Sequence, residues 1–208
     1  HVGSALSCAD IMEALYFQVA NVTKDNCKSD MRDRIVMSKG HAALAQYACL
    51  MLKGIIPRDV FDTYDLDGGL LPAHLDHDAT DGIEASTGMS LGHGVGLAEG
   101  FALANRLKKI KSRIFVIVGD GELQEGSIWE GLVSVTALNL NEITVILDRN
   151  GMQASAETKE IIDNSNLNGV FEQMGFAVET VDGHNVDAVA QALKKTDNKP
   201  RIVIANTI

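Results

Sequence analysis

Two short polar segments follow two apolar runs of the sequence, and they carry residue types that hold hard metal ions. Gly119-Asp120-Gly121 follows the apolar run at residues 114–118, and a segment containing Asn150 and Met152 follows the run at residues 143–147. The Asp120 carboxylate, the Asn150 amide oxygen and a backbone carbonyl at Met152 would give three oxygen ligands with one formal charge. Such a set suits Mg²⁺ or Ca²⁺ and leaves coordination positions open for phosphate oxygens and water.

The glycines beside Asp120 add a second feature to this pattern. Gly119 and Gly121 let the backbone approach a ligand closely, and a helix expected just beyond them would offer free N–H groups to an anion. Gly-Asp-Gly alone is a common turn tripeptide, and Asn-Gly after a strand is usually only a turn. The combination of strand, Gly-Asp-Gly, helix, strand and then an asparagine is more specific, and it predicts a diphosphate site with a divalent cation.

The elements that must position these residues alternate along the second half of the chain. Apolar runs predict buried strands at residues 114–118 and 143–147, and two further strands are predicted at residues 176–181 and 202–205. Helical periodicity predicts helices at residues 11–19, 41–53, 91–109, 127–138, 165–174 and 186–194. Ser7 and Asp10 are interpreted as a capping box for the first helix. This order predicts an α/β fold with a parallel sheet covered by helices on both faces, and ligands bind at the carboxyl ends of such strands.

Composition restricts the class of protein further. With 208 residues, of which 46% are hydrophobic, the chain can form one domain with its own core, assigned to residues 1–208. Its 28 acidic and 18 basic residues give a net charge of −10, which argues against a nucleic-acid partner. No apolar run is long enough to predict a membrane span. Three cysteines without paired spacing favour reduced thiols in the cytoplasm, and a first residue that is His1 indicates a trimmed sequence.

Several motifs, in chain order, resemble one enzyme family. The segments GDGELQEGSIWE and ILDRNGMQ resemble the N-terminal, diphosphate-binding part of the transketolases. The upstream segments HVGSALSCADIMEALYF, MSKGHAALAQYACL, LPAHLDHDATDGIEASTG and LGHGVGLAEGFALA fit the same family, so the resemblance spans essentially the whole chain. It implies the thiamine diphosphate-binding fold and the transfer of a two-carbon ketol unit from a ketose phosphate to an aldose acceptor.

The resemblance implies how the cofactor is held. Asp120, Asn150 and the Met152 carbonyl would bind Mg²⁺ or Ca²⁺, and the diphosphate of thiamine diphosphate would lie on the backbone of Gly119 and Gly121. The resemblance therefore assigns to these residues the same chemistry that their types and spacing predict.

The resemblance also implies a substrate channel and a pocket for the rest of the cofactor. His1, His41 and His74 would be the catalytic residues, because each stands in its own family motif. Gly88 would orient the aminopyrimidine ring of the cofactor, and Leu91 would pack beside that ring. The family usually reads STGSLG where this chain reads STGMSLG, so one extra residue lies in the loop over the ring and could reshape the pocket.

Other polar residues have less specific interpretations. Glu125 would lie in a carboxylate network between two subunits according to the resemblance, or it is a solvated carboxylate at a helix start. His77, His93 and His184 are interpreted as surface or capping residues. Lys39 could contact phosphate or substrate charge, but a lysine before a glycine turn is usually solvated.

The length implies that another polypeptide completes the site. In the family a second domain supplies the pyrimidine pocket and the arginines that bind phosphate, and 208 residues leave no room for it. We therefore expect a C-terminal partner subunit, in a heterotetramer that acts on sugar phosphates; a fragment of a single-chain enzyme is the alternative. The rival functions are a deoxyxylulose-phosphate synthase, an enzyme for another ketose such as a sugar acid or sulfosugar, and a non-catalytic cofactor-binding subunit. A Rossmann-type nucleotide binder is disfavoured, because no G-x-G-x-x-G follows a strand.

Overall fold

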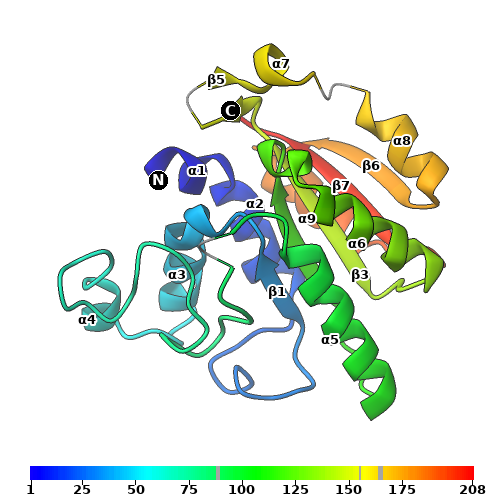
Figure 1. Ribbon diagram of the computed structural model, residues 1–208. Coiled ribbons are helices and arrows are strands. Elements are labelled where there is room, and N and C mark those ends of the chain that lie inside the picture. The colour runs from blue at the N-terminus through cyan, green and yellow to red at the C-terminus, as the bar shows by residue number, and fades with distance from the viewer. Residues whose placement is uncertain (88–89, 155, 164–165) are drawn as a thin grey trace.

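The fold is built on a five-stranded parallel sheet with helices on both faces (Figure 1). The computed structural model describes residues 1–87, 90–154, 156–163 and 166–208. The strand order is β1-β2-β3-β7-β6, with β1 (Arg34–Met37), β2 (Ile114–Gly119), β3 (Ile143–Arg149), β7 (Arg201–Asn206) and β6 (Ala177–Asp182). Two short strands, β4 (Met152–Gln153) and β5 (Ala156–Glu157), pair antiparallel beyond the end of β3. The predicted fold class is confirmed.

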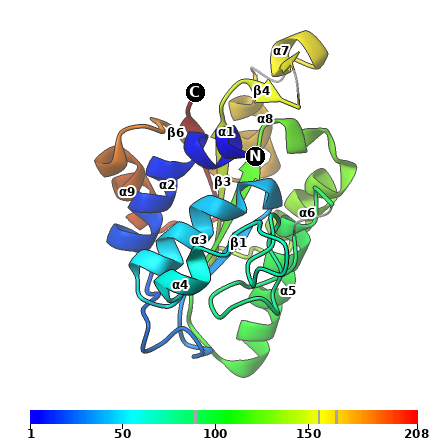
Figure 2. The ribbon, with the colours of Figure 1, turned by 90° about the vertical axis from the view of Figure 1, so that its left-hand side faces the viewer.

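The helices lie in two layers, one on each face of the sheet (Figure 2). One layer contains α1 (Val2–Ser7), α2 (Ala9–Glu13), the π-helix η1 (Ala14–Val19), α3 (Ala43–Leu52) and α9 (Val186–Lys194). The other contains α5 (Gly94–Lys108), α6 (Gly126–Ala137) and α8 (Leu167–Met174). Shorter elements lie in the connections: the 3-10 turns η2 (Gly40–Ala42) and η3 (Gly121–Gln124), and the helices α4 (Arg58–Phe61) and α7 (Thr158–Ile161).

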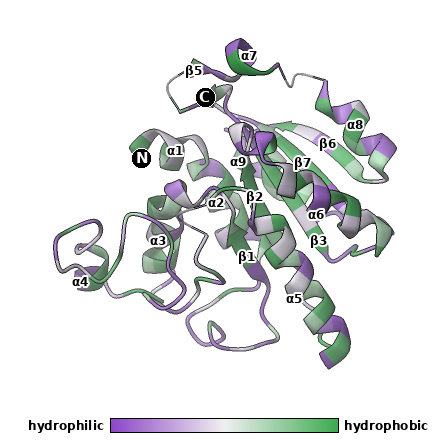
Figure 3. Ribbon diagram, viewed as in Figure 1, coloured by the Kyte–Doolittle hydropathy of each residue, from purple (hydrophilic) through white to green (hydrophobic). Residues whose placement is uncertain are grey.

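The central strands β2 and β3 are mostly apolar because both of their faces are covered (Figure 3). In β2, Phe115 and Ile117 pack with the α3 and α9 layer, whereas Ile114, Val116 and Val118 pack with the α5 and α6 layer. Side chains of a strand alternate between its faces, so a continuous apolar run serves two cores at once. This packing explains why the strand predictions at residues 114–118, 143–147 and 202–205 are confirmed.

The N-terminal segment differs from the prediction. Helical structure begins at Val2 instead of residue 11, and no side-chain cap is formed at α2. The Ser7 hydroxyl donates to the Asp148 carboxylate at 2.8 Å, so Ser7 contacts β3 instead of capping a helix. The third predicted helix also begins later, at Gly94 instead of residue 91. Strand β1 was not predicted, because its apolar run is only three residues long after Arg34.

Candidate active site

The ends of β2 and β3 bring the two polar segments together. The register pairs Gly119 with Asp148, and the Asp120 N–H donates to the Asp148 carbonyl at 3.3 Å. Asp120 and Asn150 therefore lie at the same edge of the sheet, as neighbouring parallel strands require. The first helical element after Asp120 is the short 3-10 turn η3, and α6 begins only at Gly126.

Asp120 is fixed by hydrogen bonds from both polar segments. Its carboxylate accepts from the Gly121 N–H at 2.9 Å, the Gly151 N–H at 2.8 Å and the Thr158 hydroxyl at 3.2 Å. Burial raises the pKa of Asp120, and the hydrogen bonds from Gly151, Gly121 and Thr158 oppose that shift because they stabilise the charged form. The carboxylate is thus held in one orientation at the junction of the two turns.

The predicted metal and diphosphate residues share one cavity of about 600 Å³. Asp120, Asn150, Met152 and Gly121 all line it. The Asn150 side-chain oxygen accepts from the Met152 N–H at 3.0 Å, which orients the amide toward the turn. A Cβ at Gly121 would lie 2.6 Å from the Gln153 Cβ, so only glycine fits there. A carboxylate and an amide oxygen beside a backbone free of side chains are a donor set that fits a hard cation and a diphosphate.

The three motif histidines come together beside this cavity. The His1 ring centroid lies 5.8 Å from that of His41 and 5.0 Å from that of His74. They line a second cavity of about 420 Å³, which shares His41 and Leu91 with the first. Burial, together with the positive charge of Lys39, lowers the pKa of His41 to about 4. His41 is therefore a neutral imidazole near pH 7.

Lys39 is not solvated, so that interpretation was wrong. It is 2% exposed, its ammonium forms an ion pair with the buried Asp148, and it lies 3.3 Å from the Ser7 hydroxyl. The Asp148 carboxylate also accepts from the Thr207 hydroxyl. This network lies at the wall of the larger cavity, which Lys39 and Ser7 both line.

Glu122 is a second buried carboxylate of the larger cavity that sequence reasoning missed. Burial raises the pKa of Glu122, and the Ser38 hydroxyl and backbone N–H groups oppose that shift. Its neighbour Glu125 is exposed at the start of α6. The position of Glu122 one residue after Gly-Asp-Gly was the only signal in the sequence, and it does not show which groups surround the side chain.

The remaining candidates have local partners or lie outside the described residues. Gly88 lies outside the described residues, as does the extra residue that follows it. His77, His93 and His184 are exposed, as predicted, and their rings bond to the Ile83 carbonyl, the Ser90 carbonyl and the Asp10 carboxylate.

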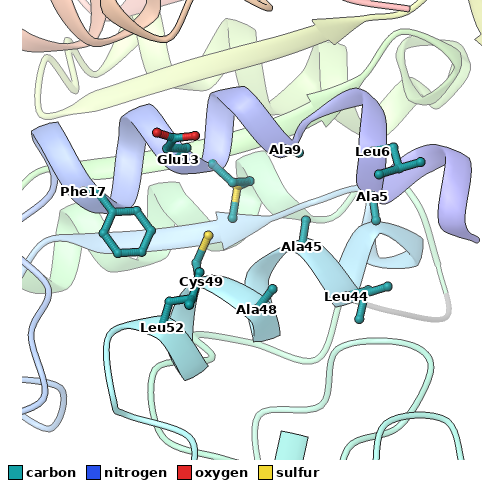
Figure 4. A pocket seen from close by; sticks show the side chains of 11 residues that line it. Ala5, Leu6, Ala9, Glu13, Phe17, Leu44, Ala45, Ala48, Cys49 and Leu52 are labelled. Atoms are coloured by element: carbon teal, nitrogen blue, oxygen red, sulfur yellow. The ribbon is translucent and has the colours of Figure 1, made fainter. Parts of the chain in front are cut away.

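An apolar groove of about 500 Å³ lies elsewhere, between α1, α2 and η1 on one side and α3 on the other (Figure 4). Leu6, Phe17, Leu44 and Leu52 are among its lining side chains, and of the described residues that line it only Glu13 is charged. The described residues of this groove do not supply the polar groups that would hold a diphosphate, so the cavity at the strand ends is the candidate active site.

Comparison with known proteins identifies the family. The family model described as "Transketolase, thiamine diphosphate binding domain" matches residues 1–208. The chain belongs to the transketolase family. The transketolase of Campylobacter jejuni has the same fold over 96% of this chain, with a TM-score of 0.88 and 30% sequence identity, and the match covers 33% of that chain.

Single subunits of transketolases are similar over a larger share of their own length. The chain is 38% identical to the 6-deoxy-6-sulfo-D-fructose transketolase subunit SqwG of Clostridium sp. (strain MSTE9), over all of this chain and 76% of that protein. It is 37% identical to one of the subunits of the apulose-4-phosphate transketolase of Actinobacillus succinogenes, over all of this chain and 75% of that protein.

In its described residues, the chain contains no helix long and apolar enough to cross a membrane.

Proposed function

We propose that this chain is the diphosphate-binding subunit of a transketolase that moves a two-carbon ketol unit from a ketose phosphate to an aldose acceptor. The observation that carries the proposal is the convergence of Asp120 and Asn150 with three histidines on two adjoining cavities. A site that binds a diphosphate and also presents proton acceptors beside it suits cleavage of a carbon–carbon bond next to a carbonyl.

Asp120, Asn150 and the Met152 carbonyl would hold Mg²⁺ or Ca²⁺, and Gly119 and Gly121 would face the diphosphate. The charges that line the cavity also favour a bound cation. The cavity is lined by the carboxylates of Asp120 and Glu122, whereas the ammonium of Lys39 is already paired with Asp148. An anionic ligand would be repelled by this lining unless a divalent cation balanced it.

The protein residues orient the substrate and move protons. Thiamine diphosphate, when bound, supplies the electron sink that allows the bond beside the ketose carbonyl to break. His41, which is neutral, would accept a proton from a substrate hydroxyl, and His1 and His74 would hold the hydroxyls and the carbonyl of the donor. Leu91 would pack against the cofactor ring, and Gly88 would orient it.

A partner chain is part of the proposal. The chain spans about three quarters of the subunit relatives but only a third of the C. jejuni transketolase chain. We infer that a C-terminal subunit supplies the pyrimidine pocket in a cytoplasmic heterotetramer, with Glu125 at an interface. The exposure of Glu125 and the free thiols of Cys8, Cys27 and Cys49 support this arrangement and location.

The test combines the protein with candidate C-terminal subunits, thiamine diphosphate and Mg²⁺, and measures ketol transfer from xylulose 5-phosphate to ribose 5-phosphate. Parallel reactions use 6-deoxy-6-sulfo-D-fructose and apulose 4-phosphate as donors, because the relatives are named for them. Tight cofactor binding without transfer from any donor would reject the enzyme function. Asp120→Ala should abolish metal-dependent cofactor binding, whereas Asp59→Ala, on the exposed face of α4, should leave it unchanged.

A further inference from the structure

The carboxylate of Glu122 joins three segments at the wall of the candidate site. One of its oxygens accepts from the Gly92 N–H at 2.7 Å and from the Ser38 hydroxyl, and the other accepts from the Gly119 N–H at 3.3 Å. Ser38 in turn accepts from the Gly94 N–H at 3.1 Å. The ends of β1 and β2 and the start of α5 are therefore tied to one side chain.

The backbone at Gly92 and Gly94, which Glu122 and Ser38 hold, is also restricted by its other neighbours. Gly92 has φ +89°, and a Cβ on it would lie 2.4 Å from the Ser127 hydroxyl oxygen, which donates to the Gly92 carbonyl at 2.9 Å. A Cβ on Gly94 would lie 2.3 Å from the Ser38 Cβ. Both glycines follow closely on Leu91. The backbone can pack this close to Ser127 and Ser38 only because the glycines have no side chains.

Leu91 is the residue whose position this arrangement sets. It lines both the cavity at the strand ends and the histidine cavity, and it directly precedes Gly92. Glu122 is 2% exposed and forms no ion pair among the residues that the structure describes, so its hydrogen bonds, with the charge of Lys39, compensate its burial. A buried carboxylate outside an ion pair is costly, and it is retained where its several acceptor positions are needed.

We propose that Glu122 is a positioning residue that fixes Leu91 against the cofactor by binding Gly92 and Ser38. The inference rests on the proposed function, because it takes thiamine diphosphate as the ligand of the cavity. Glutamate meets the geometry because its two oxygens accept three donors at once. Glutamine offers one acceptor oxygen, and alanine offers none.

The first experiment needs no cofactor. Hydrogen–deuterium exchange of the intact protein, with its partner subunit where one is present, would follow the amides of Gly92 and Gly94 in Glu122→Ala, Glu122→Gln and Ser38→Ala. We expect exchange to be about tenfold faster in Glu122→Ala, with partial recovery in Glu122→Gln. The control Glu172→Ala, on the exposed face of α8, should exchange as the wild type does. Unchanged exchange in Glu122→Ala would overturn the proposal.

The second experiment separates positioning from general loss of structure. Calorimetric titrations at fixed Mg²⁺ compare thiamine diphosphate with inorganic pyrophosphate. Ser38→Ala removes a link to α5 but leaves the bond between Glu122 and the Gly119 N–H in place, so its affinity for thiamine diphosphate should fall about fivefold to tenfold and its affinity for pyrophosphate should not change. Equal losses for both ligands, or no loss for either, would refute the positioning role. If the wild type binds neither ligand, the proposed function fails, and the exchange experiment still tests whether Glu122 holds Gly92 and Ser38.

Discussion

Replacing Lys39 with methionine should destabilise the protein strongly. Lys39 is 2% exposed and Asp148 is fully buried, so the variant leaves a carboxylate in the core without its cation. Losing one partner of a buried ion pair costs about 3–5 kcal/mol. Because the hydroxyls of Ser7 and Thr207 still donate to Asp148, we expect the lower end, about 3 kcal/mol. For a chain of this size, that loss lowers Tm by roughly 6–12 °C.

Urea unfolding followed by circular dichroism would measure the loss. The matched control is Lys28→Met, since Lys28 pairs with Asp81 at the surface with 77% and 50% of the two side chains exposed, and such pairs contribute about 0–1 kcal/mol. The double variant Lys39→Met/Asp148→Asn should recover more than half of the loss, because it removes the uncompensated charge. If Lys39→Met unfolds within about 1 kcal/mol of the wild type, the buried pair does not stabilise the fold as argued.

Three further predictions concern separate parts of the molecule. His41 should stay neutral down to about pH 4. Because its pKa in the folded protein lies below its unfolded value near 6.5, its contribution to stability is complete above pH ~6.5 and is lost as the pH falls toward 4. NMR titration of His41, and unfolding of His41→Asn across that pH range, would check this. Glu84→Ala should lower the free energy of unfolding by about 3 kcal/mol, because two arginines then lose their buried counter-charge, and a urea midpoint equal to that of the wild type would contradict this. Gly94→Ala should lower Tm through the clash with Ser38, whereas Gly96→Ala, with open space at its Cβ, should raise it by a few degrees.

The sequence predicts the centre of the sheet better than its margins. Strands β2, β3 and β7 contain apolar runs because they are buried on both faces, and such runs are visible without a structure. Strand β1 has four residues and begins with Arg34, whose charge is neutralised by Glu84 from a distant loop. A short strand with a charged end carries no period that distinguishes it from a loop.

In the candidate site, too, some residues could be predicted from the sequence and others could not. Asp120 and Asn150 follow predictable strands, so the sheet edge brings them together without further information. The environments of Lys39 and Glu122 depend instead on partners that are distant in the sequence. Asp148 lies 109 residues from Lys39, and Ser38 lies 84 residues from Glu122. Local composition contains no record of such contacts, so a lysine before a glycine is expected in solvent even where it is buried.

The long spacing between β1 and its partners has a consequence for how the protein is made. Lys39 and Asp148 are 109 residues apart, so at usual rates of synthesis roughly 5–20 s pass between the emergence of one and that of the other. Throughout that interval the buried lysine has no counter-ion, and β1 has no strand to pair with, because its neighbour β2 also lies far along the chain. Closing so long a loop is slow. The edge of the sheet that carries the candidate site therefore forms late, and the apolar residues of β1 stay unpaired until β2 has been made.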